Sequence, residues 1–200
     1  SNKSVFQAMR ENRIKSDISE EAPKSLLPQG QYRAIDSRKI TEKTCKLYDY
    51  QAGYYRNRLA HLAFVRSQQN EIVGCHIRYV EPKGFAWVGE SKKTQLFGQH
   101  TGKAGTLIIT EGELDCMSVS ECLGNAERRK TVVTSVNSGT GSVKGQIQNN
   151  IQYILGFDRV ILFFDQDEPG QKAGQDAAAI IGPKARLVTG FPYKDASEVN

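Results

Sequence analysis

The sequence has no apolar run long enough to cross a membrane and no apolar leader at its N-terminus. A membrane-spanning helix needs about 18 to 20 consecutive apolar residues, so we expect a soluble protein with no membrane partner. Cysteine is also scarce, with four in 200 residues. Because disulfides persist only in oxidising compartments, the sequence predicts free, mostly buried thiols in a reducing intracellular compartment.

The spacing of the cysteines and histidines gives no zinc site. No two cysteines form a Cys-x-x-Cys pair, and no histidine stands at a spacing suited to zinc, although structural zinc sites are built from such pairs. We therefore expect no zinc in this chain. The three histidines, His61, His76 and His100, are predicted to be surface or strand residues without a catalytic role.

A nucleotide-binding P-loop is also missing. The glycine-rich stretch at residues 137–145 has Lys144 before Gly145 and Gln146 after it, whereas a P-loop ends in Gly-Lys followed by Ser or Thr. The pattern favours a strand-to-helix loop, capped by Thr140 or Ser142.

The sequence does have an excess of positive charge, and that charge is unevenly placed. There are 27 Lys and Arg against 22 Asp and Glu, a net charge of +5. Residues 1–104 carry 18 basic and 10 acidic side chains, whereas residues 105–200 carry 9 and 12. Basic surfaces attract phosphates, so we expect an anionic partner for the first part and a cation site in the second. Uneven surface charge without function is the alternative.

The first part of the chain has the periodicity of a small antiparallel sheet. Residues 1–29 are polar and contain two prolines, which predicts a short helix and a linker. A helix capped by Thr41 should follow. Alternating apolar residues then predict strands around residues 62–64, 72–80 and 85–88, with basic side chains gathered at their turns and ends.

From residue 105 onward, short β-rich runs alternate with segments of helical periodicity. Strands are expected at residues 106–110, 131–136, 159–164 and 185–189, and helices at residues 115–123, 143–155 and 170–181. Repeated strand–helix units form a mainly parallel sheet flanked by helices. The predicted fold class is therefore α/β, with an α+β N-terminal part.

Acidic residues follow three of the expected parallel strands. Glu111 and Asp115 follow the first strand, Asp165 and Asp167 follow the third, and Asp195 follows the last. In such a sheet, ligands bind at the carboxyl ends of the strands. Neighbouring carboxylates repel one another unless divalent cations neutralise them, so the set predicts a magnesium site. For a single residue such as Asp115, capping of a helix N-terminus is the alternative.

These acidic segments resemble a known family. The segments Glu111-Gly-Glu-Leu-Asp115 and Asp165-Gln-Asp-Glu-Pro-Gly170 resemble the two signature motifs of the Toprim domain, which bacterial primases, topoisomerases and some nucleases share. More narrowly, with Lys194-Asp-Ala-Ser-Glu198, residues 32–48 and residues 96–98, the chain resembles the primase half of the phage T7-type primase-helicases, a family that includes the mitochondrial helicase Twinkle. The resemblance covers residues 30–200.

The resemblance implies a DNA primase that synthesises short RNA primers on single-stranded DNA from ribonucleoside triphosphates. It implies a metal-binding set of Glu111, Asp115, Asp165, Asp167 and Asp195, in which Glu111, Asp165 and Asp167 are catalytic and Glu111 is a candidate acid/base. The cofactor would be Mg²⁺ or Mn²⁺, as two ions that serve nucleotidyl transfer. The loop at residues 137–145 would then border the active crevice.

The basic residues around the predicted antiparallel sheet are candidates for contact with nucleotides or DNA. Together with one lysine of the second part, they are Arg78, Lys83, Lys92, Lys93 and Lys172. Three aromatic residues alternate with basic ones in the same sheet: Tyr79, Phe85 and Trp87. Their spacing fits core packing in a half-buried strand, and stacking on bases of a single strand is the alternative.

The expected organisation is a polar segment at residues 1–29, a basic RNA-polymerase subdomain at residues 30–104 and a Toprim metal-binding subdomain at residues 105–200, with the active site between the last two. The resemblance also implies a helicase domain in the full-length protein and a zinc-binding domain in cis or trans.

The same resemblance implies the cytoplasm of a phage-infected bacterium, with a mitochondrion or plastid as alternatives. Two other functions stay open. One is a different Toprim phosphodiester enzyme, such as a nuclease or topoisomerase fragment. The other is a non-catalytic DNA-binding module of a replicative helicase.

Overall fold

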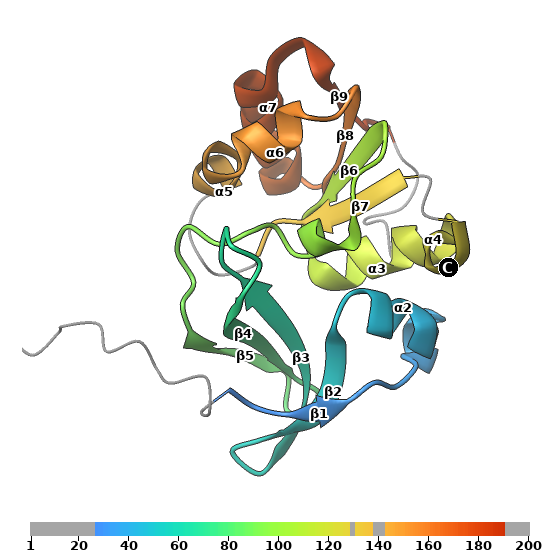
Figure 1. Cartoon of the computed structure of the whole chain (residues 1–200), viewed down its shortest axis with the longest axis vertical. Helices are drawn as coiled ribbons and strands as arrows, with labels where there is room; N and C mark the ends of the chain where they lie inside the picture. The colour runs from blue at the N-terminus through green and yellow to red at the C-terminus, as the bar shows by residue number, and fades with distance from the viewer. Residues whose placement is uncertain (1–26, 129–130, 138–142, 191–200) are drawn as a thin grey trace, which may run out of the picture.

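The structure is a computed structural model that describes residues 27–128, 131–137 and 143–190. This part of the chain forms two sheets with short helices between them and further helices on the far side of one sheet (Figure 1). One sheet is antiparallel, with strands in the order β1-β2-β3-β4-β5, and the other is parallel, in the order β7-β6-β8-β9. The expected α/β fold class, with an antiparallel sheet in its N-terminal part, is confirmed.

The antiparallel sheet follows a short 3₁₀ turn and a helix. Its elements are β1 (Gly30–Gln31), η2 (Asp36–Arg38), α2 (Glu42–Leu47), β2 (Tyr50–Tyr55), β3 (Arg58–Arg66), β4 (Ile72–Tyr79) and β5 (Gly84–Gly89). Helix α2 begins where the sequence predicted, because the Thr41 hydroxyl accepts the Thr44 amide at 3.4 Å. Strand β2 was not expected, since its Gln-Ala-Gly sequence shows no clear alternation of apolar residues.

The parallel sheet and its helices follow the predicted order. The elements are η3 (Gln99–Thr101), β6 (Thr106–Thr110), α3 (Glu113–Cys122), α4 (Asn125–Arg128), β7 (Thr131–Ser135), α5 (Val143–Asn149), α6 (Ile151–Leu155), β8 (Arg159–Phe163), α7 (Glu168–Ile181), η4 (Gly182–Lys184) and β9 (Ala185–Leu187).

The single helix predicted for residues 143–155 was wrong, because Asn150 separates α5 from α6. Its side-chain amide donates to the backbone oxygens of Gln146 and Thr94, and its Oδ1 accepts from Gln68. An asparagine with such partners competes with the regular helical bonding.

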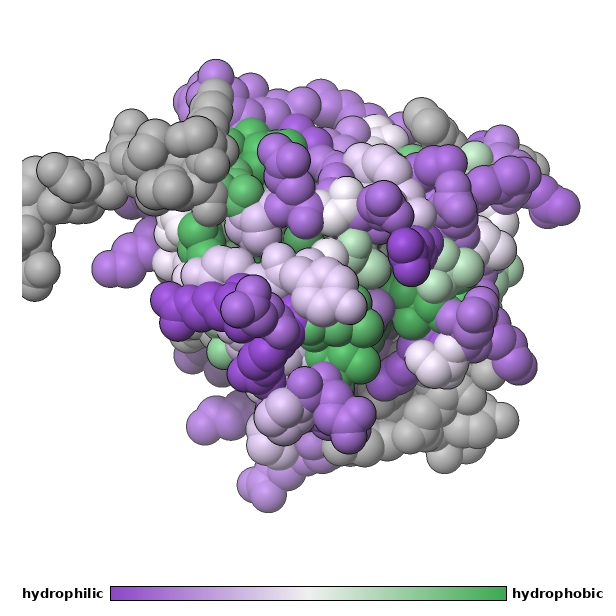
Figure 2. All heavy atoms as spheres, turned by 90° about the horizontal axis from the view of Figure 1, so that it is seen from below, coloured by the Kyte–Doolittle hydropathy of each residue, from purple (hydrophilic) through white to green (hydrophobic). Residues whose placement is uncertain are grey.

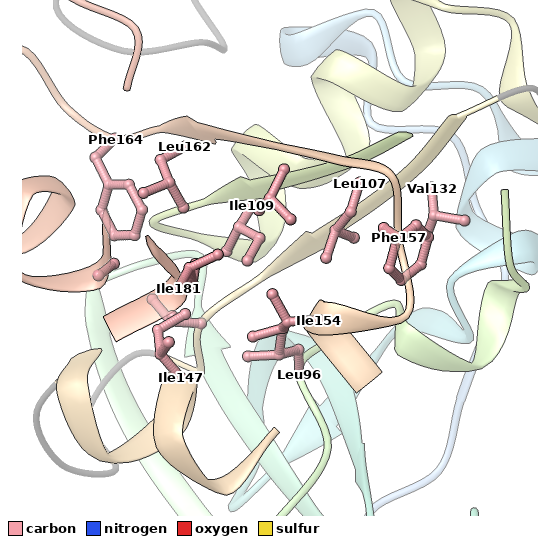
Figure 3. Packing of buried hydrophobic residues seen from close by; sticks show 13 residues of the cluster. Leu96, Leu107, Ile109, Val132, Ile147, Ile154, Phe157, Leu162, Phe164 and Ile181 are labelled. Carbon is pink, nitrogen blue, oxygen red and sulfur yellow. The ribbon is translucent and has the colours of Figure 1, made fainter. Parts of the chain in front are cut away.

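The two faces of the parallel sheet bury different cores. On one face, Leu107 and Ile109 pack with Leu162 and with residues of α5, α6 and α7 (Figure 3). On the other face, Ile108 packs in a second core, in which α3 contributes Met117. This alternation, with successive residues of one strand in different cores, explains why β6 reads as a continuous apolar run.

The antiparallel sheet also has two distinct faces. One face buries Leu62, Cys75 and Ile77 in a third core, and Tyr79 belongs to it, which confirms core packing for that aromatic residue. We call the opposite face the inner face, because its residues contact the layer that contains α3. Seen from below the antiparallel sheet, the molecular surface is mostly hydrophilic, with small, separate hydrophobic patches (Figure 2).

The chain between the two sheets is fixed to strand β7. Phe97 forms an antiparallel bridge with Ser135, with backbone hydrogen bonds of 3.0 Å in both directions. Asn137 donates through its side-chain amide to the Gln95 backbone oxygen at 2.9 Å. The bridge pairs the last residue of β7 on its outer side, where β7 is an edge strand of the parallel sheet.

The four cysteines are free, and the structure buries Cys45, Cys75 and Cys116 while exposing Cys122. This agrees with the expectation of free, mostly buried thiols. Among the residues that the structure describes, no helix has both the length and the apolar character needed to span a membrane.

Candidate active site

The first acidic motif stands at the carboxyl end of β6, in a tight turn into α3. β6 lies between β7 and β8, so its end is near the middle of the sheet edge. The Thr110 hydroxyl is within hydrogen-bond distance of the backbone oxygens of Gly112, at 3.1 Å, and Thr134, at 3.3 Å, which fixes the turn. Half-buried Glu111 is thereby placed directly at the strand end.

Asp115 folds back over the start of α3. A Cβ atom at Gly112 would come within 3.0 Å of Asp115 Oδ2, so the glycine leaves room for this carboxylate. The first turn of a helix favours negative charge because its backbone N–H groups are unpaired within the helix. The position of Asp115 therefore fits both a role at the helix terminus and a role in binding a cation.

The second acidic motif meets the first at the same sheet edge. The parallel register pairs Thr110 of β6 with Phe163 of β8, so the residues that follow the two strands lie side by side. The Asp165 backbone N–H donates to Glu111 Oε2 at 3.4 Å. The two motifs, 54 residues apart in sequence, thus form one local structure.

Asp167 has a structural role in addition to its expected one. It is the N-cap of α7, and its Oδ1 accepts the Gly170 amide at 3.0 Å. Gly170 lies so close to the backbone oxygen of Asp165 that a Cβ atom there would overlap it. Gln171 donates through its side chain to the same oxygen at 3.3 Å. The loop that carries Asp165 and Asp167 is therefore held against the start of α7.

Of the five predicted metal ligands, Glu111 accepts a hydrogen bond from the backbone amide of Asp165, and Asp115 and Asp167 lie at the starts of α3 and α7. Asp195 lies outside the described residues. Within residues 27–128, 131–137 and 143–190, no three His, Cys, Asp or Glu side chains are grouped to hold one metal ion. Magnesium is commonly bound through one or two carboxylates while it keeps several waters, so the Glu111–Asp165 pair fits such an ion by its ligand chemistry. The full five-residue set stays a prediction.

A buried contact links this edge to the inner face of the antiparallel sheet. His76 Nδ1 on β4 lies 2.7 Å from Glu113 Oε1 in α3, and the two side chains are 6% and 9% exposed. His76 was expected to be a surface or strand residue, and no partner was predicted for it. One sequence pattern could have indicated that His76 faces a partner. His76 and Arg78 are two residues apart, which puts both side chains on one face of β4.

Arg78 lies on the same inner face. Burial raises the pKa of the Tyr50 phenol well above its usual value, the negative charge of Glu113 raises it further, and the positive charge of Arg78 opposes this. Both charges therefore act on Tyr50, which belongs to the core between the sheet and α3. Of the basic residues predicted to bind phosphates, Arg78 lies on the same face of β4 as His76, which contacts Glu113.

The four predicted lysines are exposed at other places on the surface. One stands in the turn between β4 and β5, two in the loop after β5, and one in α7: Lys83, Lys92, Lys93 and Lys172. Exposed lysines are free to reach phosphates, and their contacts with nucleotides or DNA stay a prediction.

A cavity of about 240 Å³ lies away from these carboxylates. Leu47, Tyr48, Lys103 and Asn125 line it, together with Thr131 at the first residue of β7. The acidic motifs follow the last residues of β6 and β8, so the cavity is at the opposite edge of the sheet and is not part of the candidate site.

A comparison with protein families and curated proteins identifies the chain's relatives. A family of Toprim-like domains matches residues 108–200. The DNA helicase/primase of Enterobacteria phage T3 is 32% identical over 170 residues, which are 84% of this chain and 29% of that protein. The chain thus spans less than a third of the length of this curated relative.

Solved structures give the same result. The primase fragment of the bacteriophage T7 primase-helicase superposes with a TM-score of 0.76 at 32% identity, over 86% of this chain and 70% of the fragment. T7 primase domains solved with the lagging-strand DNA polymerase, an RNA/DNA hybrid and dTTP superpose with a TM-score of 0.75, over 86% of this chain and 85% of that chain. With both Toprim motifs at one sheet edge, this chain belongs to the Toprim primases of the phage primase-helicase family.

Proposed function

We propose that this chain is a DNA primase domain that synthesises short RNA primers on single-stranded DNA from ribonucleoside triphosphates. The observation that carries this proposal is the hydrogen bond between the Asp165 amide and Glu111, which joins the two Toprim motifs at the edge of the parallel sheet. Membership of the primase family supports the same reaction.

The proposed reaction is a nucleotidyl transfer. The oxygen of a 3′-hydroxyl forms a bond to the α-phosphorus of a ribonucleoside triphosphate, and the bond from that phosphorus to the bridging oxygen breaks, so that pyrophosphate leaves. Glu111 is half-buried at the strand end, and it would accept the proton of the attacking hydroxyl as a general base.

The acidic residues would hold divalent cations. Two Mg²⁺ or Mn²⁺ ions, when bound, would supply charge neutralisation at the phosphates and activation of the hydroxyl. Glu111, Asp115, Asp165, Asp167 and Asp195 would be their ligands. The contact of Asp167 with Gly170 engages one carboxylate oxygen, which leaves the second oxygen for a cation.

The basic residues would bind the phosphates of the template and of the triphosphates. Arg78 is half-buried on the inner face, two residues along β4 from His76, which contacts Glu113. The exposed lysines at positions 83, 92, 93 and 172 would extend this positive surface. We accordingly propose residues 30–104 as the RNA-polymerase subdomain and residues 105–200 as the metal-binding subdomain.

The partners follow from the relatives. The T3 relative is a DNA helicase/primase, so we propose that this chain works beside a helicase domain in the full-length protein. We also propose a zinc-binding domain, in cis or in trans, that reads the template. The proposed location is the cytoplasm of a phage-infected bacterium.

Extension of a short RNA annealed to single-stranded DNA, with Mg²⁺ and labelled ribonucleoside triphosphates, tests the proposal without a need for sequence-specific initiation. The Asp165→Ala variant should lose at least about 100-fold in extension rate, because a catalytic carboxylate is removed. Asp158→Ala is the matched control, since Asp158 is exposed just before β8, at the opposite sheet edge. Equal extension by the wild-type protein and Asp165→Ala would contradict the proposal.

Two further reactions separate the alternatives. Labelled DNA incubated with Mg²⁺ but without triphosphates would be cleaved by a Toprim nuclease and should stay intact here. DNA binding without any extended product from the wild-type protein would favour a non-catalytic binding module.

A further inference from the structure

The inner face of the antiparallel sheet ends in an exposed aromatic side chain at the sheet edge. Phe85 lies on β5, which is an edge strand, and 62% of its surface is exposed. Cross-strand pairing sets Phe85 opposite Arg78 and Trp87 opposite His76. The four side chains therefore form one group on two neighbouring strands, with three aromatic rings and the Arg78 guanidinium.

The Phe85 ring packs against the buried His76 ring. Its ring is stacked on the His76 ring, with centroids 5.4 Å apart and an interplanar angle of 13°. The His76 ring is 5.3 Å from the Trp87 ring and is fixed by its hydrogen bond to Glu113. The Trp87 indole N–H donates to the Glu90 backbone oxygen at 3.2 Å. An exposed ring with such supports is oriented before any ligand arrives.

A positive charge stands beside the same ring. The Arg78 guanidinium carbon is 5.4 Å from the Phe85 ring centroid, within the range of a cation–π contact. By comparison, Tyr54 on β2 is 70% exposed, and no ring in the described part of the chain packs against it. Phe85 thus combines exposure, a fixed orientation and a neighbouring cation.

An exposed, oriented ring beside a positive charge is suited to binding unpaired nucleic acid. Proteins that bind single strands pair a positive surface for the phosphates with aromatic rings on which bases stack. The support beneath Phe85 also reaches the acidic motif, because His76 contacts both Phe85 and Glu113, and Glu113 is two residues from Glu111. A base on Phe85 would therefore lie on the side of the sheet that faces the candidate active site.

We propose that Phe85, backed by His76 and flanked by Arg78 and Trp87, is a stacking site for one unpaired nucleobase. The base belongs either to the template strand or to an incoming ribonucleotide, which share the same aromatic chemistry. This inference rests on the proposed primase function and assigns a base-binding position to it.

Binding measured in EDTA tests the site without catalysis. Isothermal titration calorimetry measures the affinity of every ligand, with or without a base, and quenching of Trp87, the single tryptophan of the chain, additionally reports a base that stacks nearby. One arm uses a thymidine oligonucleotide and an abasic oligonucleotide of the same length. The other arm uses UTP and a base-free ribose triphosphate. Phe85→Ala and Phe85→Tyr are compared with wild type, and Tyr54→Ala is the control for loss of an exposed ring.

Phe85→Ala should weaken binding of the base-containing ligand about 5-fold to 100-fold in at least one arm. Phe85→Tyr, which keeps a ring, should stay within about twofold of wild type, and abasic or base-free ligands should bind equally to all variants. The arm that responds identifies the base as template or nucleotide.

The proposal is overturned if Phe85→Ala binds both base-containing ligands as well as wild type does, or loses as much affinity for the abasic ligands. Either result leaves the primase function standing if wild-type protein extends primers. Base-dependent binding by a wild-type protein that extends no primer would overturn the primase function and keep the stacking site.

Discussion

His76 Nδ1 on β4 and Glu113 Oε1 on α3 are 2.7 Å apart and shielded from solvent on both sides of the contact. The residues belong to different layers, so their hydrogen bond ties the antiparallel sheet to the helix that begins with the first acidic motif. The position of Arg78 and Phe85 relative to the acidic motifs depends on how these two layers are placed.

Removal of one partner of this pair should be costly. Glu113→Ala leaves the buried His76 nitrogen without its hydrogen-bond partner, and a buried polar group left unsatisfied costs about 1–3 kcal/mol. Glu127→Ala removes an exposed acidic residue whose ion pair with Lys43 is worth at most about 1 kcal/mol. Urea unfolding measures both. Similar losses in the two variants would show that the buried contact adds no stability.

The stability of the protein should fall as the pH drops below about 6.5. Burial, with a further contribution from Arg78, lowers the pKa of His61 below its ordinary value. The unfolded chain then takes up a proton near pH 6.5 that the folded chain resists, so acid favours unfolding. His100 acts in the same direction, because burial and Arg66 lower its pKa.

His61→Phe should reduce this acid sensitivity while it keeps a ring against Tyr50, whose ring centroid is 5.6 Å away. Urea midpoints between pH 7.5 and about pH 5, above the range where most carboxylates titrate, measure the slope. An unchanged slope in His61→Phe, and also in the variant that adds His100→Phe, would refute the assignment.

Asp167 should show two separable roles. Asp167→Asn keeps an oxygen for the Gly170 amide and should retain the helix cap, whereas Asp167→Ala should lower the free energy of unfolding by about 1 kcal/mol. Both variants remove the negative charge, and both should lose primer extension. Thermal unfolding and the extension assay together separate the roles; full activity in Asp167→Asn would limit this residue to capping.

Gly170→Ala should displace the loop that carries Asp165. The added methyl group would meet the Asp165 backbone oxygen, which cannot move without the carboxylate loop. We expect a loss of about 1–3 kcal/mol in stability and a clear loss of primer extension. At Gly84 a Cβ atom would have only an ordinary 3.7 Å contact with Tyr79, so Gly84→Ala should behave like wild type. Equal activity of the two variants would argue against this tight contact.

The arrangement of the acidic motifs could be predicted because it follows from topology. Glu111 and Asp165 each come directly after a short buried strand, and parallel strands end at a common edge. Their expected proximity is seen in the structure, whereas the role of Asp195 stays a prediction. The cap at Thr41 was similarly predictable, since it depends on residues three positions apart.

Contacts between layers could not be predicted in the same way. His76 and Glu113 are 37 residues apart and lie in elements of different periodicity, so no local pattern pairs them. The break at Asn150 has the same origin, because its side chain bonds to Thr94 in the segment between the sheets. The His76–Glu113 contact and the break between α5 and α6 both depend on tertiary structure, so the periodicity of the sequence does not predict them.

The bridge between Phe97 and Ser135 has a consequence for how the protein can be divided. A fragment that began at Thr106 would keep every strand of the parallel sheet but would leave Ser135, at the end of the outer edge of β7, without its backbone partner Phe97. Unprotected edges pair with other chains. We therefore expect the segment before β6 to reduce strand pairing between copies at this end of β7, so a soluble catalytic fragment should begin ahead of Thr94 rather than at the first parallel strand.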